Sequence, residues 1–94
     1  MDRQLAAKIG RLLWRGRFSA TPHAHEEMWE DGISVLDLIN VAGNMERLET
    51  LTDDPRGPRY RFEGLSWGRR IGVVARMTPF GRLRIITTYE VEEA

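Results

Sequence analysis

The side chains best suited to chemistry in this sequence are one histidine, one tyrosine and a group of arginines. His23 follows Thr21-Pro22, a pair typical of a helix start, so we expect it in the first helical turn. There the helix dipole favours neutral imidazole, which can act as a general base. The hydroxyl of Tyr89 can donate a proton, and its ring can stack on a base. Structural roles stay open for both residues: His23 as a buttress of the helix start, and Tyr89 in the core.

The arginines of the second half are candidate ligands for phosphate, because a guanidinium can fork onto two phosphate oxygens. Thr88 has a hydroxyl and is expected to point away from the core, so it is a further candidate contact. The alternative is a solvated sheet face, or ion pairs between the arginines and acidic helices. The candidate phosphate ligands among the arginines are Arg59, Arg61, Arg76 and Arg84.

The sequence predicts no metal site and no cofactor. It contains no cysteine, and its only two histidines are His23 and His25. Residues two positions apart do not share a helix face, so this pair is a poor metal site. We therefore expect His25 at the surface or partly buried.

Charge is segregated along the chain although the net charge is zero. The net charges are +4 over residues 1–17, −8 over 18–54, +7 over 55–89 and −3 over 90–94. Such asymmetry is typical of a polyanion-binding face, and it also arises when acidic and basic segments pair with each other. Both interpretations stay open.

Helical periodicity dominates the first half of the chain. Leu5, Ile9, Leu12 and Leu13 form one apolar stripe, which predicts a helix over residues 3–15. Thr21-Pro22 opens a second helix, which ends near residue 30 before Asp31-Gly32. Ser34 with an acid three residues later resembles a capping box and opens a third helix, ended by Gly43-Asn44.

After residue 44 the period changes from 3.6 to 2. Strands are predicted over residues 45–51, 59–63, 70–78 and 82–91, and turn-forming residues separate them. Short connections of this kind join antiparallel neighbours. We therefore predict one α+β domain over residues 1–94, in which N-terminal helices pack on a three- to four-stranded antiparallel β-meander.

Strict alternation along these strands predicts which side chains share a face. Leu83, Ile85, Thr87, Tyr89 and Val91 are expected to face the helices. Six arginines are then expected on the other face: Arg59, Arg61, Arg70, Arg76, Arg82 and Arg84.

The three tryptophans are expected in two settings. Trp14 and Trp29 are expected to pack between helices. Trp67 lies in a predicted turn, where it is expected to be exposed and available to a partner.

The N-terminus lacks the charged-then-apolar pattern of a signal peptide, and no apolar run approaches the ~20 residues of a membrane span. A cytoplasmic protein without membrane contact is expected.

The segment from Phe18 to Ser34, with its order Thr21-x-His23-Ala24 and then Gly32-Ile33-Ser34, carries a recognisable pattern. Arg56-Gly57-Pro58-Arg59-Tyr60 and Thr87-Thr88-Tyr89 follow in order. The set resembles a widespread bacterial domain family of unknown function over residues 18–90, with residues 1–17 outside the match. That family is similar to the RelE, MqsR and BrnT toxins, which share a small RNase fold of the RelE/barnase kind.

The resemblance implies a toxin-like ribonuclease of a toxin–antitoxin pair that cleaves RNA without a metal, with His23 as the first choice of base. RNA, a small antitoxin protein and a second copy of the chain are the implied partners. Glu27 and Asp31 stand where the family often has arginine. Two other functions stay open: a non-catalytic protein-interaction module of the same fold, and nucleic-acid binding without cleavage.

Overall fold

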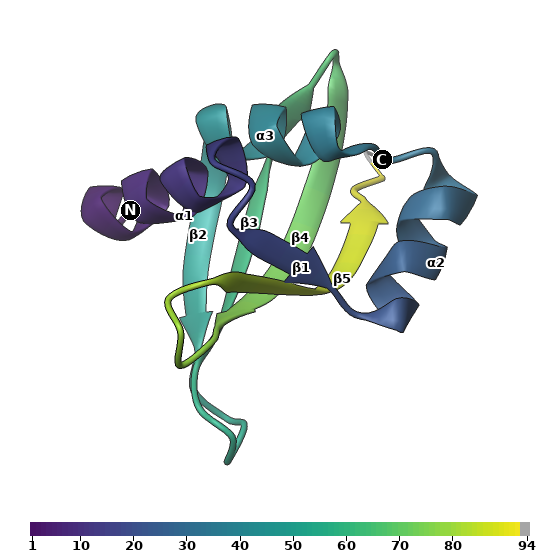
Figure 1. Cartoon of the computed structure of the whole chain (residues 1–94). Coiled ribbons are helices and arrows are strands. Elements are labelled where there is room, and N and C mark those ends of the chain that lie inside the picture. The colour runs from purple at the N-terminus through teal and green to yellow at the C-terminus, as the bar shows by residue number, and fades with distance from the viewer. Residues whose placement is uncertain (93–94) are drawn as a thin grey trace.

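A computed structural model describes residues 1–92, with three helices and five strands in one sheet. Pairing between neighbouring strands gives the sheet order β1-β5-β4-β3-β2. The contacts put α3 over β3, α1 against α3, and α2 beside β5 (Figure 1). The elements are α1 (Arg3–Trp14), β1 (Phe18–Ala20), α2 (Pro22–Asp31), α3 (Val35–Gly43), β2 (Met45–Leu51), β3 (Arg59–Ser66), β4 (Arg69–Met77) and β5 (Leu83–Glu90).

Local capping explains why the three helices start where the sequence predicts. Asp2 accepts a hydrogen bond from the Leu5 N–H at 3.0 Å, and Thr21 Oγ1 accepts one from the Ala24 N–H at 3.1 Å. Ser34 and Asp37 cap each other's backbone N–H groups in a full capping box. Each cap uses residues three positions apart, so the signal is readable in the sequence.

The α+β class is confirmed, but the predicted strand count and polarity are wrong. The sheet has five strands, and β1 runs parallel to β5, with Phe18 beside Leu83 and Ala20 beside Ile85. The other three pairings are antiparallel. Three residues are too few to show alternation, and β1 finds its partner more than 60 positions away, so nothing local indicates this strand.

A β-bulge in β5 overturns the predicted facing of its last residues. Val74 pairs with Thr87 and Ala75 pairs with Ile85, which leaves Ile86 as an extra residue. An extra residue turns every later side chain to the opposite face. Thr88 therefore faces the helices and is fully buried, whereas Tyr89 lies on the side of the sheet away from them.

The core lies between the helices and the sheet, and its largest members include Phe62, Ile9, Leu13 and Leu38. Trp14 and Trp29 do not pack between helices as expected: their exposed fractions are 75% and 88%. Each lies outside the buried stripe of its helix. None of the helices within residues 1–92 is long and apolar enough to cross a membrane.

Candidate functional site

The sheet side that faces away from the helices, here called the outer face, carries most charged side chains of the strands. Arg69 is on the helix side, where it donates to the Asp31 and Gly32 carbonyls. Alternation puts Arg61 and Glu63 opposite the buried Phe62, and Arg84 between the buried Leu83 and Ile85. The outer face thus holds the following predicted site residues: Arg59, Arg61, Arg76, Arg84 and Tyr89.

Tyr89 and Glu63 form the central contact of this face. The Tyr89 hydroxyl donates a hydrogen bond to Glu63 Oε2 at 3.0 Å, and Arg47 Nη1 lies 3.9 Å from Glu63 Oε1. The Tyr89 ring lies over Gly72 of β4, where a Cβ atom would overlap it. Since Gly72 pairs with both Glu63 and Tyr89 across the sheet, its missing side chain makes the contact between them possible.

The environment keeps Tyr89 protonated. Burial, followed by the hydrogen bond to Glu63, raises the pKa of Tyr89 to about 12. The side chain of Glu63 is 13% exposed and accepts the hydrogen bond from the Tyr89 hydroxyl. The pair therefore presents one neutral proton donor and one carboxylate acceptor on an open face, and the alternative that Tyr89 packs in the core is wrong.

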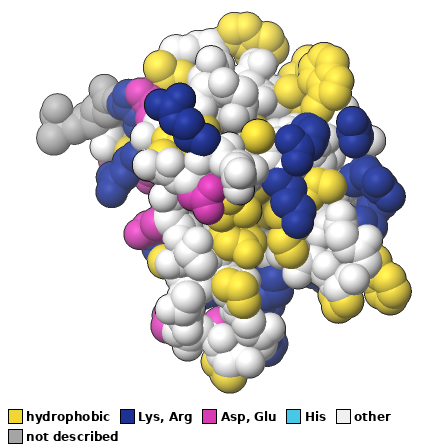
Figure 2. All heavy atoms as spheres, turned by 90° about the vertical axis from the view of Figure 1, so that its left-hand side faces the viewer, with side chains coloured by type: hydrophobic (Ala, Val, Ile, Leu, Met, Phe, Trp, Pro, Cys, Tyr) yellow, Lys and Arg dark blue, Asp and Glu magenta, His cyan; other side chains and the backbone are white. Residues whose placement is uncertain are grey.

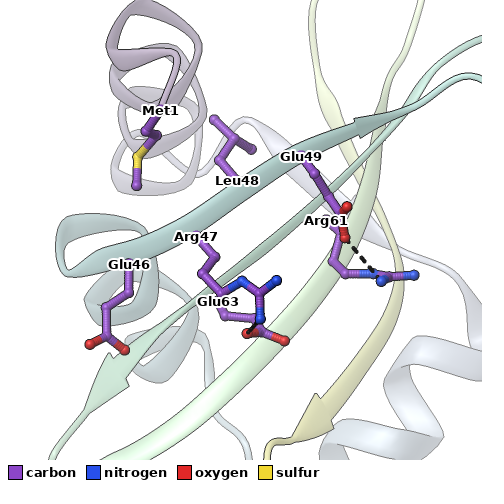
Figure 3. Close-up of a pocket in the computed structure, with 7 residues that line it drawn as sticks. All are labelled: Met1, Glu46, Arg47, Leu48, Glu49, Arg61 and Glu63. Carbon is purple, nitrogen blue, oxygen red and sulfur yellow. Dashed lines mark hydrogen bonds and ion pairs between the residues drawn. The ribbon is translucent and has the colours of Figure 1, made fainter.

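A hollow of about 310 Å³ adjoins Glu63 at the β2 edge. Figure 3 shows Met1 and Leu48 on one side of β2, and the paired side chains on the other. There Arg61 Nη1 lies 3.0 Å from Glu49 Oε1. The hollow is lined by Met1, Glu46, Arg47, Leu48, Glu49, Arg61 and Glu63.

Most arginines of the sheet are neutralised, but not by the helices. Arg69 reaches Glu90 at the end of β5, and its guanidinium also donates to the backbone carbonyls of Asp31 and Gly32. Arg84 forms no ion pair within residues 1–92. The remaining partners are acids of β2 and of the β2–β3 loop: Glu46 for Arg70, Glu49 for Arg61, Asp53 for Arg59 and Asp54 for Arg76.

His23 lies apart from this group. Its side chain is 69% exposed in the first turn of α2, and Nε2 lies 3.4 Å from Glu27 Oε1. That carboxylate oxygen also accepts a hydrogen bond from the Thr88 N–H at 3.2 Å. No hydrogen bond or ion pair within residues 1–92 joins His23 to Tyr89 or to an arginine.

One expectation about this region needs correction. Thr88 cannot contact a ligand on the outer face, because it is fully buried on the helix side. Its Oγ1 has no hydrogen-bond partner within residues 1–92. Glu27, which stands where the resembling family often has arginine, satisfies the backbone of β5 and pairs with His23. His25 is exposed, as expected.

Sequence reasoning missed Glu63, Arg47 and Glu49. A usable signal existed for Glu63, since it is the only acid in residues 55–89 and alternates in register with Arg59 and Arg61. The partners on β2 had no such signal, because their positions depend on the pairing of β2 with β3.

Unneutralised positive charge is concentrated on α1 and the residues after it. Figure 2 views the α1 and β2 side, where Lys and Arg side chains surround a central apolar area. The exposed basic residues of α1 and of the residues after it are Arg3, Lys8, Arg11, Arg15 and Arg17.

No group of three or more His, Asp or Glu residues within residues 1–92 is placed to hold a metal.

Comparison with known proteins adds a family but no activity. No curated protein and no solved structure matches the chain. Residues 20–90, which include both halves of the Tyr89–Glu63 contact and exclude α1, match a family described as a domain of unknown function, DUF4258. The chain therefore belongs to the DUF4258 family.

Proposed function

We propose that this protein is a metal-independent, toxin-like ribonuclease of a bacterial toxin–antitoxin pair, with a fold of the RelE/barnase kind. The observation that carries the proposal is the hydrogen bond between Tyr89 and Glu63 on an open sheet face, with Arg47 and Arg61 beside it. RNA cleavage without a metal needs a proton acceptor, a proton donor and cations close together. This group of side chains supplies all three.

The proposed reaction conserves protons. Glu63 removes the proton of a ribose 2′-hydroxyl, and the 2′-oxygen attacks the adjacent phosphorus. Arg61 neutralises the charge that develops on the phosphoryl oxygens. Tyr89 gives its proton to the departing 5′-oxygen, so the P–O5′ bond breaks and a 2′,3′-cyclic phosphate remains. The proton on Glu63 then returns to Tyr89 across their hydrogen bond.

The basic surface of α1 supports capture of the RNA. Its cations are exposed, and Met1 at its N-terminal end lines the hollow beside Glu63. Long-range attraction by such cations raises the association rate and weakens as salt is added. A cytoplasmic location follows from this proposal, because its substrate is cellular RNA.

His23, the base that the family resemblance implies first, is the alternative to Glu63. Its Nε2 lies 3.4 Å from Glu27 Oε1, so the carboxylate can orient the imidazole. Among residues 1–92 the side chain of His23 forms no hydrogen bond or ion pair with an arginine, so a reaction centred on His23 needs cations that this structure does not pair with it.

The test is incubation of the purified protein with single-stranded RNA, with and without ribosomes, in the presence of a chelator. The products are analysed for 2′,3′-cyclic phosphate ends by mass spectrometry. Glu63→Gln and Tyr89→Phe are compared with His23→Ala and with Glu46→Gln. Glu46→Gln is the matched control, because Glu46 lines the same hollow but pairs with Arg70.

Loss of cleavage in Glu63→Gln and Tyr89→Phe, with activity kept in the Glu46→Gln control, is the expected outcome. Loss in His23→Ala alone would transfer the role of base to α2. Intact RNA with the wild-type protein, both free and on ribosomes, would refute the ribonuclease proposal.

A second candidate function, a non-catalytic module that binds a protein partner, is favoured by the elbow between α2 and α3. Trp29 and Leu36 are exposed there, and a shallow depression of about 560 Å³ lies beside them. Arg69 donates to the Gly32 carbonyl at 3.0 Å, which holds the exposed Trp67 turn near the elbow. The depression is lined by His25, Met28, Trp29, Gly32, Ile33, Ser34 and Val35.

Charge indicates which partner fits this elbow. Exposed Glu26, Glu30 and Asp31 are neighbours of the lining residues along α2, so the complementary ligand is an amphipathic segment with Lys or Arg beside apolar anchors. Tryptophan fluorescence is measured while a basic amphipathic peptide, or an acidic peptide of the same apolar pattern, is added. Trp29→Ser should weaken binding of the basic peptide, whereas Trp14→Ser should not. Equal binding of both peptides would contradict the proposal.

A further inference from the structure

One end of the outer face carries three arginines in a cross-strand row. Arg76 of β4 pairs directly with Arg84 of β5. Arg59 of β3 lies beside Arg76, one step beyond the Tyr60–Ala75 pair. Like charges placed directly opposite each other destabilise a sheet. These three residues, here called the arginine row, therefore require a counter-anion.

Asp54 of the β2–β3 loop supplies part of that negative charge. Its Oδ2 lies 2.7 Å from Arg76 Nη2 and 3.9 Å from Arg59 Nε, and its side chain is 11% exposed. Hydrogen bonds from the backbone and guanidinium of Arg56, and from Arg76, hold the pKa of Asp54 well below its usual range. The carboxylate therefore stays ionised. The β2–β3 loop that carries it extends well beyond the sheet (Figure 1).

This neutralisation is incomplete. The Nε atoms of Arg59 and Arg76 are buried, and neither has a hydrogen-bond acceptor in the part of the chain that the structure describes. Arg84, at the end of the row, is exposed and has no acidic partner within residues 1–92. Buried donors are seldom left unpaired in proteins. Asp53 pairs with Arg59 and Asp54 with Arg76, so among residues 1–92 Arg84 is left without an acid. A tetrahedral phosphate offers more acceptor oxygens than a planar carboxylate.

We propose that the arginine row is a binding site for a phosphate group, and that Asp54 is a resident competitor which the phosphate displaces. The inference deepens the proposed ribonuclease function, because it adds a second subsite to the same face. Arg59 lies four residues from Glu63 along β3, about 13 Å at the usual rise of a strand. A phosphate held by the row thus belongs to a flanking nucleotide and not to the bond that breaks.

Binding is measured without cleavage. A fluorescent 2′-O-methyl oligoribonucleotide, which lacks the attacking hydroxyl, reports the phosphodiester backbone by anisotropy. Inorganic phosphate, exchanged for chloride at constant ionic strength, reports a free phosphate group by its effect on Tm. The variants are Asp54→Asn, Asp54→Asn with Arg84→Gln, and Asp53→Asn. Asp53 is the control acid, because it is 78% exposed and pairs with Arg59 alone.

We expect Asp54→Asn to tighten binding of the oligonucleotide by about tenfold, the scale of one charge-assisted contact, and Arg84→Gln to reverse the gain. Asp53→Asn should change binding by less than about twofold, as for other exposed pairs. A gain for both probes shows that a phosphate group alone suffices. A gain for the oligonucleotide only assigns the row to the nucleic-acid backbone.

Unchanged binding in Asp54→Asn, or a gain that Arg84→Gln does not reverse, would overturn the proposal. If Asp54→Asn does not fold, Arg84→Gln is compared with the wild type, since Arg84 has no ion pair to lose among residues 1–92. Phosphate should then raise the Tm of the wild type more than that of Arg84→Gln, and equal shifts would overturn the proposal. A protein that binds through the row but never cleaves RNA would keep this site and lose only the proposed activity.

Discussion

Replacement of Gly72 by alanine should displace Tyr89 from its place on the outer face. A Cβ atom at Gly72 would overlap the Tyr89 ring, and Gly72 sits between Tyr89 and Glu63 in the cross-strand register. Central strands cannot move aside without breaking their pairing on both sides. The ring is therefore the part that gives way, and the hydrogen bond to Glu63 is lost with it.

The magnitude follows from three effects. Overpacking in a well-packed region costs about 1–3 kcal/mol. Loss of a hydrogen bond to a charged acceptor costs about 1.5–3 kcal/mol. Alanine in place of glycine within a strand returns about 0.5–1 kcal/mol. We expect Gly72→Ala to lower the free energy of unfolding by about 1.5–5.5 kcal/mol, a large share of the stability of a small domain.

The assay is urea denaturation followed by tryptophan fluorescence, arranged as a double-mutant cycle with Tyr89→Ala. Without the ring, the three atoms nearest to the alanine Cβ are gone, so Gly72→Ala should cost much less in that background. Gly10→Ala is the matched control. Gly10 lies inside α1 with nothing within 4 Å of its Cβ position. There the same substitution should stabilise the protein by about 1 kcal/mol.

The reasoning would be refuted if Gly72→Ala lowered the free energy of unfolding by the same amount in the wild-type protein and in the Tyr89→Ala variant. The cost would then arise from the strand backbone and not from the ring. The Gly72→Ala variant should also lose RNA cleavage if Tyr89 is the proton donor, and retained cleavage would remove Tyr89 from the proposed mechanism.

Three further outcomes are expected. Asp37→Asn should lower the free energy of unfolding by about 2–4 kcal/mol in urea denaturation, because it weakens the capping box and the 2.6 Å hydrogen bond from Ser66. Burial opposes ionisation of Asp37, but the hydrogen bonds from Ser34 and Ser66 outweigh it and lower its pKa. The resulting stability is complete above the unfolded-state pKa of about 3.9 and is lost as the pH falls through the folded-state pKa. The stability of the Asp37→Asn variant should therefore depend less on pH in this acid range. The pH dependence due to Tyr89 has the opposite sign. Its raised pKa contributes stability that is complete below pH 10 and is lost as the pH rises to about 12. Tyr89→Phe should show no such loss of stability in that pH window when unfolding is followed by circular dichroism. Glu27→Ala should cost about 1–3 kcal/mol because it leaves the Thr88 N–H unpaired, whereas His23→Ala, which removes an exposed partner, should cost less than about 1 kcal/mol; equal losses in thermal melts would contradict this assignment.

The predictions that succeeded depended on residues close together in sequence. The N-terminal ends of α2 and α3 are set by Thr21-Pro22 and by Ser34 with Asp37, which act within one helical turn. Alternation of Arg59, Arg61 and their apolar neighbours likewise gave the correct facing of β3. These signals need no knowledge of the rest of the chain.

The candidate site was only partly predictable. Sequence placed Tyr89 and the arginines in strands, but Glu63 became relevant only when the bulge at Ile86 turned Tyr89 toward it. A bulge within the apolar pair Ile85-Ile86 does not alter the hydropathy pattern. Strict alternation therefore predicted the wrong face of the sheet for the residues after the bulge, including Thr88.

The sequence by itself determined the α+β class, the three helix starts, the alternating strands and the membership of the matched family segment. Tertiary structure alone decided the parallel pairing of β1, the facing of Tyr89 and Thr88, and the partners of the arginines. The physical reason is range. Caps and alternation act over a few residues, whereas strand pairing, the bulge and the ion pairs join positions tens of residues apart, and their geometry exists only after the sheet has assembled.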